Sequence, residues 1–260
     1  MGECIVPAFW AFWGLSLGSF VNVLAYRLPK GESLWRPASH CPRCGKPVAF
    51  YDNVPLVSFV LLRGRCRGCR GRISWRYPLA EALMGAMVLG LWWRWRPDSS
   101  WIVLSSGAAA VLAAVALIDW ETFLIPDSLS LGLLAAGLVA SPFNPILGDA
   151  WGWRLLHCAA GAAFGFALCW AVAEFGERLF KKEAMGGGDI KLLAAVGAWT
   201  GVLGAFDCLL IGSFVGAAYG VVLLARRKVR RQDPIPFGPF LSVGAAVDLF
   251  YVLPFGFPFN

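Results

Sequence analysis

Long apolar stretches separated by short polar or basic segments dominate the chain. Eight of them approach the roughly 20 residues that an α-helix needs to cross a bilayer. Their approximate positions are 5–26, 79–95, 101–118, 128–145, 153–175, 190–206, 207–225 and 237–256. The sixth and seventh are nearly continuous and are split only around residues 204–207. The pattern predicts an all-α polytopic membrane protein with about eight transmembrane helices.

Composition and charge agree with this prediction and add an orientation. The sequence is 58% hydrophobic and 15% charged, against about 25% charged residues in soluble domains. With the N-terminus outside, 20 of the 23 Lys and Arg residues lie in segments on the inner side. Those segments are 27–78, 119–127, 176–191 and 226–233. The positive-inside rule favours this orientation, which accounts for the net charge of +7 without a nucleic-acid partner.

A short segment, residues 27–78, is too basic and too rich in cysteine to cross the membrane. We expect it to form a small cytoplasmic domain between the first helix (1–26) and the remaining transmembrane part (79–260). It contains two Cys-x-x-Cys pairs separated by 21 residues. Two thiolates on one turn can bind one ion, and four complete a tetrahedral Zn²⁺ site. The expected ligands of a structural Zn²⁺ are Cys41, Cys44, Cys66 and Cys69.

Other uses of these cysteines are weaker alternatives. Disulfides are disfavoured in a reducing cytosol, and a redox pair would need a thioredoxin-like context that the sequence lacks. An iron–sulfur cluster uses the same ligands but is less common at this spacing.

Two acidic residues lie at predicted membrane boundaries. Asp119 closes the third apolar stretch, and Asp189 follows three glycines at the start of the sixth. The predicted orientation places both at the cytoplasmic face. Ionisable residues near hydrocarbon are functional candidates, and two neighbouring carboxyl groups can share a proton and activate water. The pair therefore predicts aspartic-protease chemistry, provided that the two side chains meet.

Asp189 and the nearby loop acid Asp127 also have purely structural explanations, whereas Asp119 is harder to explain in this way because it closes a long apolar run. Asp189 is explained equally well as a helix cap with Lys191 reaching to the interface, and Asp127, which follows Pro126, as a capping or first-turn acid. The glycines allow close backbone approach, but the spacing of a phosphate-binding loop is absent. A proton-coupled transporter also uses membrane acids, usually near the midplane of repeated halves. Asp248 lies about midway along the last predicted span, without an identifiable partner.

The order and spacing of these motifs resemble those of the bifunctional type IV prepilin peptidases, also called prepilin leader peptidase/N-methyltransferases. The resemblance covers nearly the whole chain and includes both cysteine pairs. Its other segments are 17–29, 51–55, 73–78 with Glu81, 119 with 125–127, 186–192 and 236–240. Relatives that only cleave often lack the Cys-rich insertion. In having it, the chain resembles the members of the family that carry out both reactions.

The resemblance implies a reaction and a set of residues. Asp119 and Asp189, the latter in a GxGD pattern, would be the catalytic pair, supported by Gly186, Gly188, Lys191 and Asp127. They would cleave the basic leader of prepilins or pseudopilins at the cytoplasmic face of a bacterial inner membrane. Methylation of the new N-terminus would follow, with S-adenosylmethionine as donor.

The location of methyl transfer is less defined by the sequence. Candidate residues are Glu81, Asp52 and Asn53, although the last two also suit a turn ahead of Pro55. Three alternatives remain: a peptidase without methylation, a presenilin-like GxGD protease of another family, and a zinc-stabilised transporter that uses Asp119 and Asp189.

Overall fold

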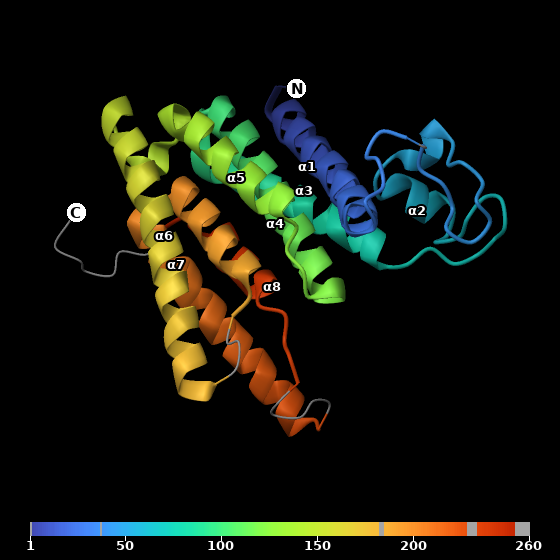
Figure 1. Cartoon of the computed structure of the whole chain (residues 1–260). Helices are drawn as coiled ribbons and strands as arrows, with labels where there is room; N and C mark the ends of the chain where they lie inside the picture. The colour runs from blue at the N-terminus through green and yellow to red at the C-terminus, as the bar shows by residue number, and fades with distance from the viewer. Residues whose placement is uncertain (1, 37, 182–184, 228–232, 253–260) are drawn as a thin grey trace. The chain divides into compact units, whose positions relative to one another are not determined.

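The computed structural model describes residues 2–36, 38–181, 185–227 and 233–252 (Figure 1). Within these residues there is no β-strand, only two isolated bridges. The α-helices are α1 (Gly2–Arg27), α2 (Val57–Leu61), α3 (Arg76–Trp95), α4 (Ser99–Thr122), α5 (Asp127–Ala140), α6 (Trp151–Phe180), α7 (Gly187–Ala225) and α8 (Gly238–Asp248). Short 3₁₀ turns are Leu28–Lys30, Phe50–Asn53, Ser141–Phe143 and Pro145–Leu147. The predicted all-helical class is confirmed.

Four described helices are long and apolar enough to cross a membrane: Ile5–Lys30, Ser99–Thr122, Trp151–Leu179 and Gly187–Ala225. A shorter apolar segment runs over Asp127–Phe143. The structure therefore supports a polytopic membrane protein, while the predicted number of eight spans is not confirmed.

The sixth and seventh predicted spans are both contained in α7, which is broken at Gly201 rather than at 204–207. Gly201 has φ 75° and ψ −170°, a left-handed conformation that glycine adopts without a steric penalty. Helix α7 therefore consists of two helical parts that meet at a kink at this residue. The buried Asn144 side chain donates to the Trp199 carbonyl at 2.6 Å, so it satisfies an acceptor that the break removes from the helical pattern. A contact distant in sequence thus fixes the break.

The last predicted span, 237–256, is longer than the helix that forms. Helix α8 ends at Asp248 after 11 residues, and residues 253–256 lie outside the described part of the chain. Apolar composition continues beyond Asp248, but an apolar run alone does not determine where a helix stops.

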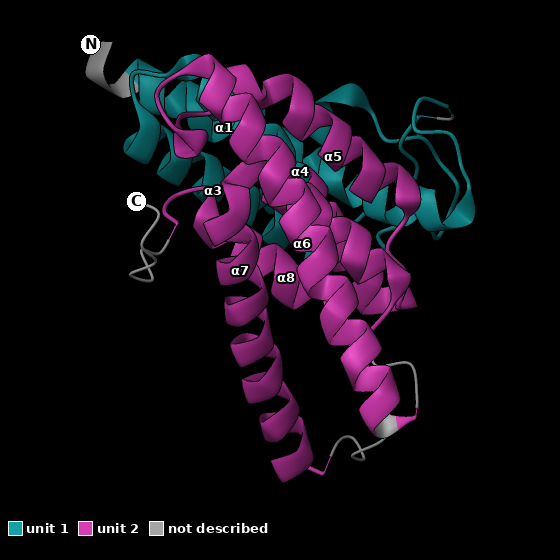
Figure 2. Cartoon of the chain, turned by 60° about the vertical axis from the view of Figure 1, so that its left-hand side comes forward, with its two compact units in different colours: residues 1–110 teal, residues 111–260 magenta. Residues whose placement is uncertain are grey.

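The chain divides into two compact units, residues 1–110 and 111–260, with the boundary inside α4 (Figure 2). In the first unit, α1 and α3 pack closely because Gly14 and Gly18 lack side chains. A Cβ added at Gly18 would come within 2.5 Å of the Glu81 Cα atom. Small residues at such crossings are typical of membrane helices.

The second unit is built around α7. Its first part packs on α6 where Gly161 meets Gly197, each occupying space that a Cβ on the other would need. Its second part packs on α8, where a Cβ at Gly212 would lie 3.2 Å from the backbone of Phe240 and Leu241. The starts of α7 and α8 and the end of α4 are thereby held within one unit.

Candidate active site and metal centre

Asp119 lies in the last turn of α4 and is only 5% exposed. Its Oδ2 atom accepts a hydrogen bond from the backbone N–H of Gly238 at 2.8 Å. Gly238 begins α8, so the first turn of that helix directs a donor at the carboxyl group. A Cβ at this glycine would lie 2.8 Å from the same oxygen. The close approach therefore requires glycine at position 238.

Asp189 occupies the third position of α7 and is buried. Its Oδ2 atom accepts from the Gly186 backbone N–H at 3.2 Å, whereas the buried Oδ1 atom has no hydrogen-bond partner. Gly238, which donates to Asp119, and Gly188, which precedes Asp189, both lie against Ile125. The structure thus places the two acids that the sequence singles out around the same residue, and one carboxylate oxygen is left for another group.

The three glycines before Asp189 differ in their surroundings. A Cβ at Gly188 would lie 2.9 Å from the Cβ of Ile125, whereas a Cβ at Gly187 would meet nothing within 4 Å. Gly186 has φ −72° and ψ 147°, which any residue can adopt. Close packing on Ile125 therefore requires glycine only at position 188, directly beside the acid.

Asp127 and Lys191 connect the starts of α5 and α7. Lys191 Nζ lies 2.7 and 2.8 Å from the two carboxylate oxygens of Asp127. Asp127 is also the first residue of α5, as expected for a first-turn acid. Lys191 forms an ion pair and does not only extend to the membrane interface. Both side chains are solvent-exposed, so this ion pair contributes little to the free energy of folding. It does connect the first turns of α5 and α7.

Aromatic side chains pack beside the last turn of α4. Trp120 lies next to Tyr219 with ring centroids 5.4 Å apart, and Tyr219 lies next to Phe240 at 5.6 Å. These contacts join α4, the second part of α7 and α8 near Asp119.

This arrangement suits acid–base chemistry on a polar bond. Two carboxyl groups close together in a buried site cannot both be ionised cheaply, so the favoured state shares a proton between them. The Gly238 and Gly186 N–H groups each orient one carboxyl group. Such a pair can activate water with one member and donate a proton with the other.

The four predicted cysteine ligands form a cluster in the first unit. Their sulfur atoms lie within 4.8 Å of one another, and the Cys41 and Cys69 sulfurs are 3.9 Å apart. That distance is far beyond the roughly 2.05 Å of a disulfide. It is close to the separation of about 3.8 Å that two ligands have in a tetrahedral site with Zn–S bonds of 2.3 Å. The donor set therefore fits Zn²⁺.

Each cysteine pair sits on a knuckle of the same design. The backbone N–H of Gly45 donates to the Cys41 carbonyl, and that of Arg70 donates to the Cys66 carbonyl, both at 2.9 Å. Gly45 and Arg70 both have positive φ. Backbone N–H groups of Cys69 and Gly68 lower the pKa of Cys66 to about 7, which favours the thiolate that binds metal.

The three residues considered for methyl transfer differ in their surroundings. Glu81 is buried, and its Oε2 atom accepts the Leu56 backbone N–H at 2.8 Å. Both carboxylate oxygens of Asp52 accept from Arg67 at 2.7 Å, and this hydrogen-bonded guanidinium lowers the pKa of Asp52. Asn53 is exposed. Asp52 and Glu81 are thus engaged with different partners.

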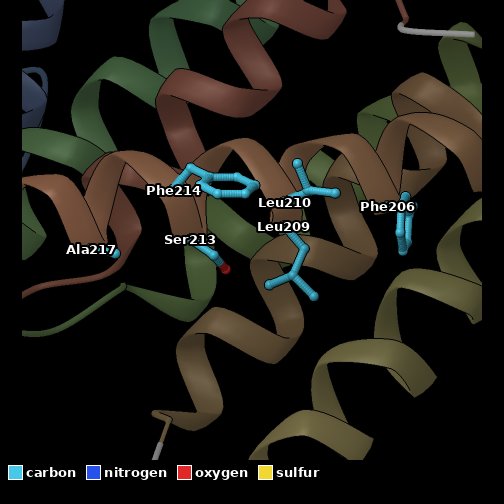
Figure 3. A pocket seen from close by; sticks show the side chains of 6 residues that line it. All are labelled: Phe206, Leu209, Leu210, Ser213, Phe214 and Ala217. Carbon is cyan, nitrogen blue, oxygen red and sulfur yellow. The ribbon is translucent and has the colours of Figure 1, made fainter. Parts of the chain in front are cut away.

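An open apolar hollow of about 450 Å³ lies along the second part of α7 (Figure 3). Its lining is Phe206, Leu209, Leu210, Ser213, Phe214 and Ala217. None of these side chains titrates near neutral pH, so the hollow lacks the groups for hydrolysis and suits an apolar chain instead.

Gly238 is the contact that sequence reasoning missed. It is part of the segment 236–240 that carries the resemblance, but a backbone donor leaves no chemical signature in a side-chain pattern. The glycine between two Pro-Phe pairs is the one available signal.

Comparison with known proteins agrees with the motifs. Residues 12–95 match the bacterial Peptidase A24 N-terminal domain, and residues 106–221 match the type IV leader peptidase family. The chain is 37% identical to the prepilin leader peptidase/N-methyltransferase of Burkholderia pseudomallei, over 95% of this chain and 86% of that protein. It is 36% identical to the proteins of the same name from Aeromonas salmonicida and Pseudomonas aeruginosa, over 92% of this chain and 88% of each of them. No solved structure matches. The chain belongs to the type IV leader peptidase family.

Proposed function

We propose that this protein is a membrane aspartic endopeptidase that removes the basic leader of prepilins or pseudopilins and then methylates the new N-terminus. The observation that carries the proposal is the burial of two acids, Asp119 and Asp189, whose neighbouring glycines pack on the same residue, Ile125, inside the segment that matches the peptidase family. The names of the relatives support both reactions.

In the proposed reaction, one carboxylate of the pair takes a proton from water, whose oxygen attacks the scissile carbonyl carbon. The protonated partner donates a hydrogen bond to the carbonyl oxygen. Collapse of the tetrahedral intermediate breaks the C–N bond, and the leaving amine receives a proton from the pair. The Gly238 and Gly186 N–H groups keep the carboxyl groups oriented, while Gly188 keeps Asp189 close to Ile125.

The substrate would combine a positively charged leader with an apolar helix lying in the bilayer. This places its scissile bond at the cytoplasmic boundary, the side on which the Lys and Arg count puts both acids. We infer that the protein crosses a bacterial inner membrane eight times. Helix α7 would supply two of these spans, one on each side of Gly201. The first helix (1–26), the Cys-rich domain (27–78) and the peptidase core (79–260) are the functional divisions of this proposal.

Cys41, Cys44, Cys66 and Cys69 would hold a structural Zn²⁺ ion. The distances between their sulfur atoms support a closed tetrahedral site. Bound Zn²⁺ supplies folding free energy to a domain of this kind and takes no part in peptide cleavage.

Methyl transfer rests on the names of the relatives rather than on a site in this chain. S-adenosylmethionine would supply the methyl group to the α-amine that cleavage exposes. The carboxylates of Asp52 and Glu81 already bind Arg67 and Leu56, so we assign no residue to this step.

Mass spectrometry of a purified prepilin tests the proposal directly. After incubation with the protein in lipid or detergent, the substrate should lose its leader, and with S-adenosylmethionine it should also gain one methyl group. Cleavage without the methyl group would reduce the function to a peptidase alone. Ion flux in vesicles without any cleavage would support the transporter instead and would refute the proposal.

A further inference from the structure

Two more acids lie in the second unit and take no part in the proposed reaction. Asp207, on the second part of α7, and Asp248, the last residue of α8, are both 0% exposed. Neither oxygen of the Asp248 carboxyl group has a hydrogen-bond partner. An ionised carboxylate without water or a partner costs several kcal/mol or more in such surroundings. An acid in this position therefore needs a physical explanation.

The packing of α7 against α8 places the two acids within one helical turn of each other. The backbone of α8 at Phe240 and Leu241 lies against Gly212. One turn further along α8, Gly244 lies against Cys208, where a Cβ would come within 2.6 Å of the Cys208 carbonyl oxygen. The Cys208 thiol donates to the Leu241 carbonyl at 3.2 Å. Because the helices run antiparallel in this register, the next turn of α8 brings Asp248 opposite Gly204, three residues from Asp207 and on the same face of α7.

Electrostatics agrees with this placement. The neighbouring charge that acts on Asp248 is that of Asp207, which has the same sign. Two like charges in a dehydrated site are not both tolerated, and one carboxyl group keeps its proton. A protonated carboxyl group is an O–H donor, so the pair can satisfy itself.

We propose that Asp207 and Asp248 share a proton across the α7–α8 interface, and that this second carboxyl pair is a positioning device for the catalytic acid Asp119. Helix α8 is only 11 residues long, about 15 Å between its ends. It begins with the Gly238 N–H that binds Asp119 and ends with Asp248. The shared proton fixes the far end of the same short helix. The role in positioning rests on the proposed peptidase function, whereas the shared proton does not.

Asparagine and leucine at position 248 separate the possible roles. Asp248→Asn keeps the size and a neutral hydrogen-bonding group, so cleavage should stay within about threefold of the parent. Asp248→Leu removes the donor and should lower cleavage at least tenfold, together with the melting temperature. Asp149→Asn, which neutralises an exposed acid of the same unit, is the matched control and should change neither.

Infrared spectroscopy measures the proton without using cleavage. The difference between parent and Asp248→Asn at neutral pH should contain the carbonyl stretch of a protonated carboxylic acid. A missing band, or a band that disappears when Na⁺ is added, would overturn the shared proton. Loss of cleavage in a folded Asp248→Asn protein would also overturn the proposal, because it would mean that the charge is required. Unchanged cleavage in Asp248→Leu would refute the role in positioning. A parent that shows the band but never cleaves would refute the peptidase function instead.

Discussion

Replacing Gly188 with alanine would place a new Cβ 2.9 Å from the Cβ of Ile125. Carbon atoms in contact prefer about 3.5–4.0 Å, so the first turn of α7 or the segment at Ile125 must move by roughly 0.6–1.1 Å. Ile125 lies in the connection between α4, which carries Asp119, and α5. Asp189 is the next residue after Gly188. The movement therefore changes the separation of the two acids.

The size of the effect follows from the precision that the reaction needs. A displacement of about 1 Å can lower a catalysed rate by about 10²-fold. This corresponds to about 2.7 kcal/mol of transition-state stabilisation at 1.36 kcal/mol for each tenfold change. We expect kcat/KM for prepilin cleavage to fall roughly 10–100-fold in Gly188→Ala. The main effect should be on kcat, because the displaced carboxyl groups act in the chemical step.

Gly187→Ala is the matched control, because its Cβ would meet nothing within 4 Å. Alanine should be tolerated there. Cleavage of a purified prepilin by each variant in the same lipid, with thermal unfolding measured in parallel, gives the comparison. Equal activity of the two variants would refute the argument from packing, as would a Gly187→Ala variant that is the more damaged of the two.

Three further predictions concern the surroundings of this site. Gly238→Ala, whose Cβ would lie 2.8 Å from Asp119 Oδ2, should lose a hydrogen bond to a charged group worth roughly 1.5–3 kcal/mol; cleavage should fall by about 10–150-fold, and an unchanged rate would contradict the role of the bond. Removing Zn²⁺ with a chelator, or changing Cys41 to Ser, should abolish metal binding worth about 10–16 kcal/mol and expose residues 27–78 to proteases. A metal-free protein with unchanged protection there would disprove the structural role. Asp127→Asn and Lys191→Gln should show a coupling of at most about 1 kcal/mol in a double-mutant cycle on unfolding, because these side chains are 59% and 40% exposed; a coupling above about 2 kcal/mol would show a buried, stronger interaction.

Features that depend on residue type and spacing were predictable from the sequence. The Cys-x-x-Cys pairs indicate their cluster because few arrangements satisfy four thiolates. Asp119 and Asp189 stand out because acids are rare beside apolar runs, and counting Lys and Arg assigns them to one face. The structure places the glycines beside both acids, Gly238 and Gly188, against the same residue, Ile125.

Features that depend on long-range contacts were not predictable. The break in α7 lies at Gly201 because Asn144, far away in sequence, binds the Trp199 carbonyl. The residues on both sides of this break are equally apolar, so the hydrophobic pattern predicted the break at 204–207 instead of at Gly201. Likewise, nothing in the sequence pattern links Gly238 to Asp119 or places Asp248 within one helical turn of Asp207. Those relations follow from the packing of α8 on α4 and on α7.

Cleavage of a prepilin by Asp119→Asn and Asp189→Asn tests the central claim most directly. Each variant keeps the shape of its side chain and removes one ionisable group, so both should bind Zn²⁺ and fold as the parent does. Because a carboxyl pair acts as a unit, each single change should reduce cleavage to the background rate. Full activity in either folded variant would contradict the assignment of Asp119 and Asp189 as the catalytic pair.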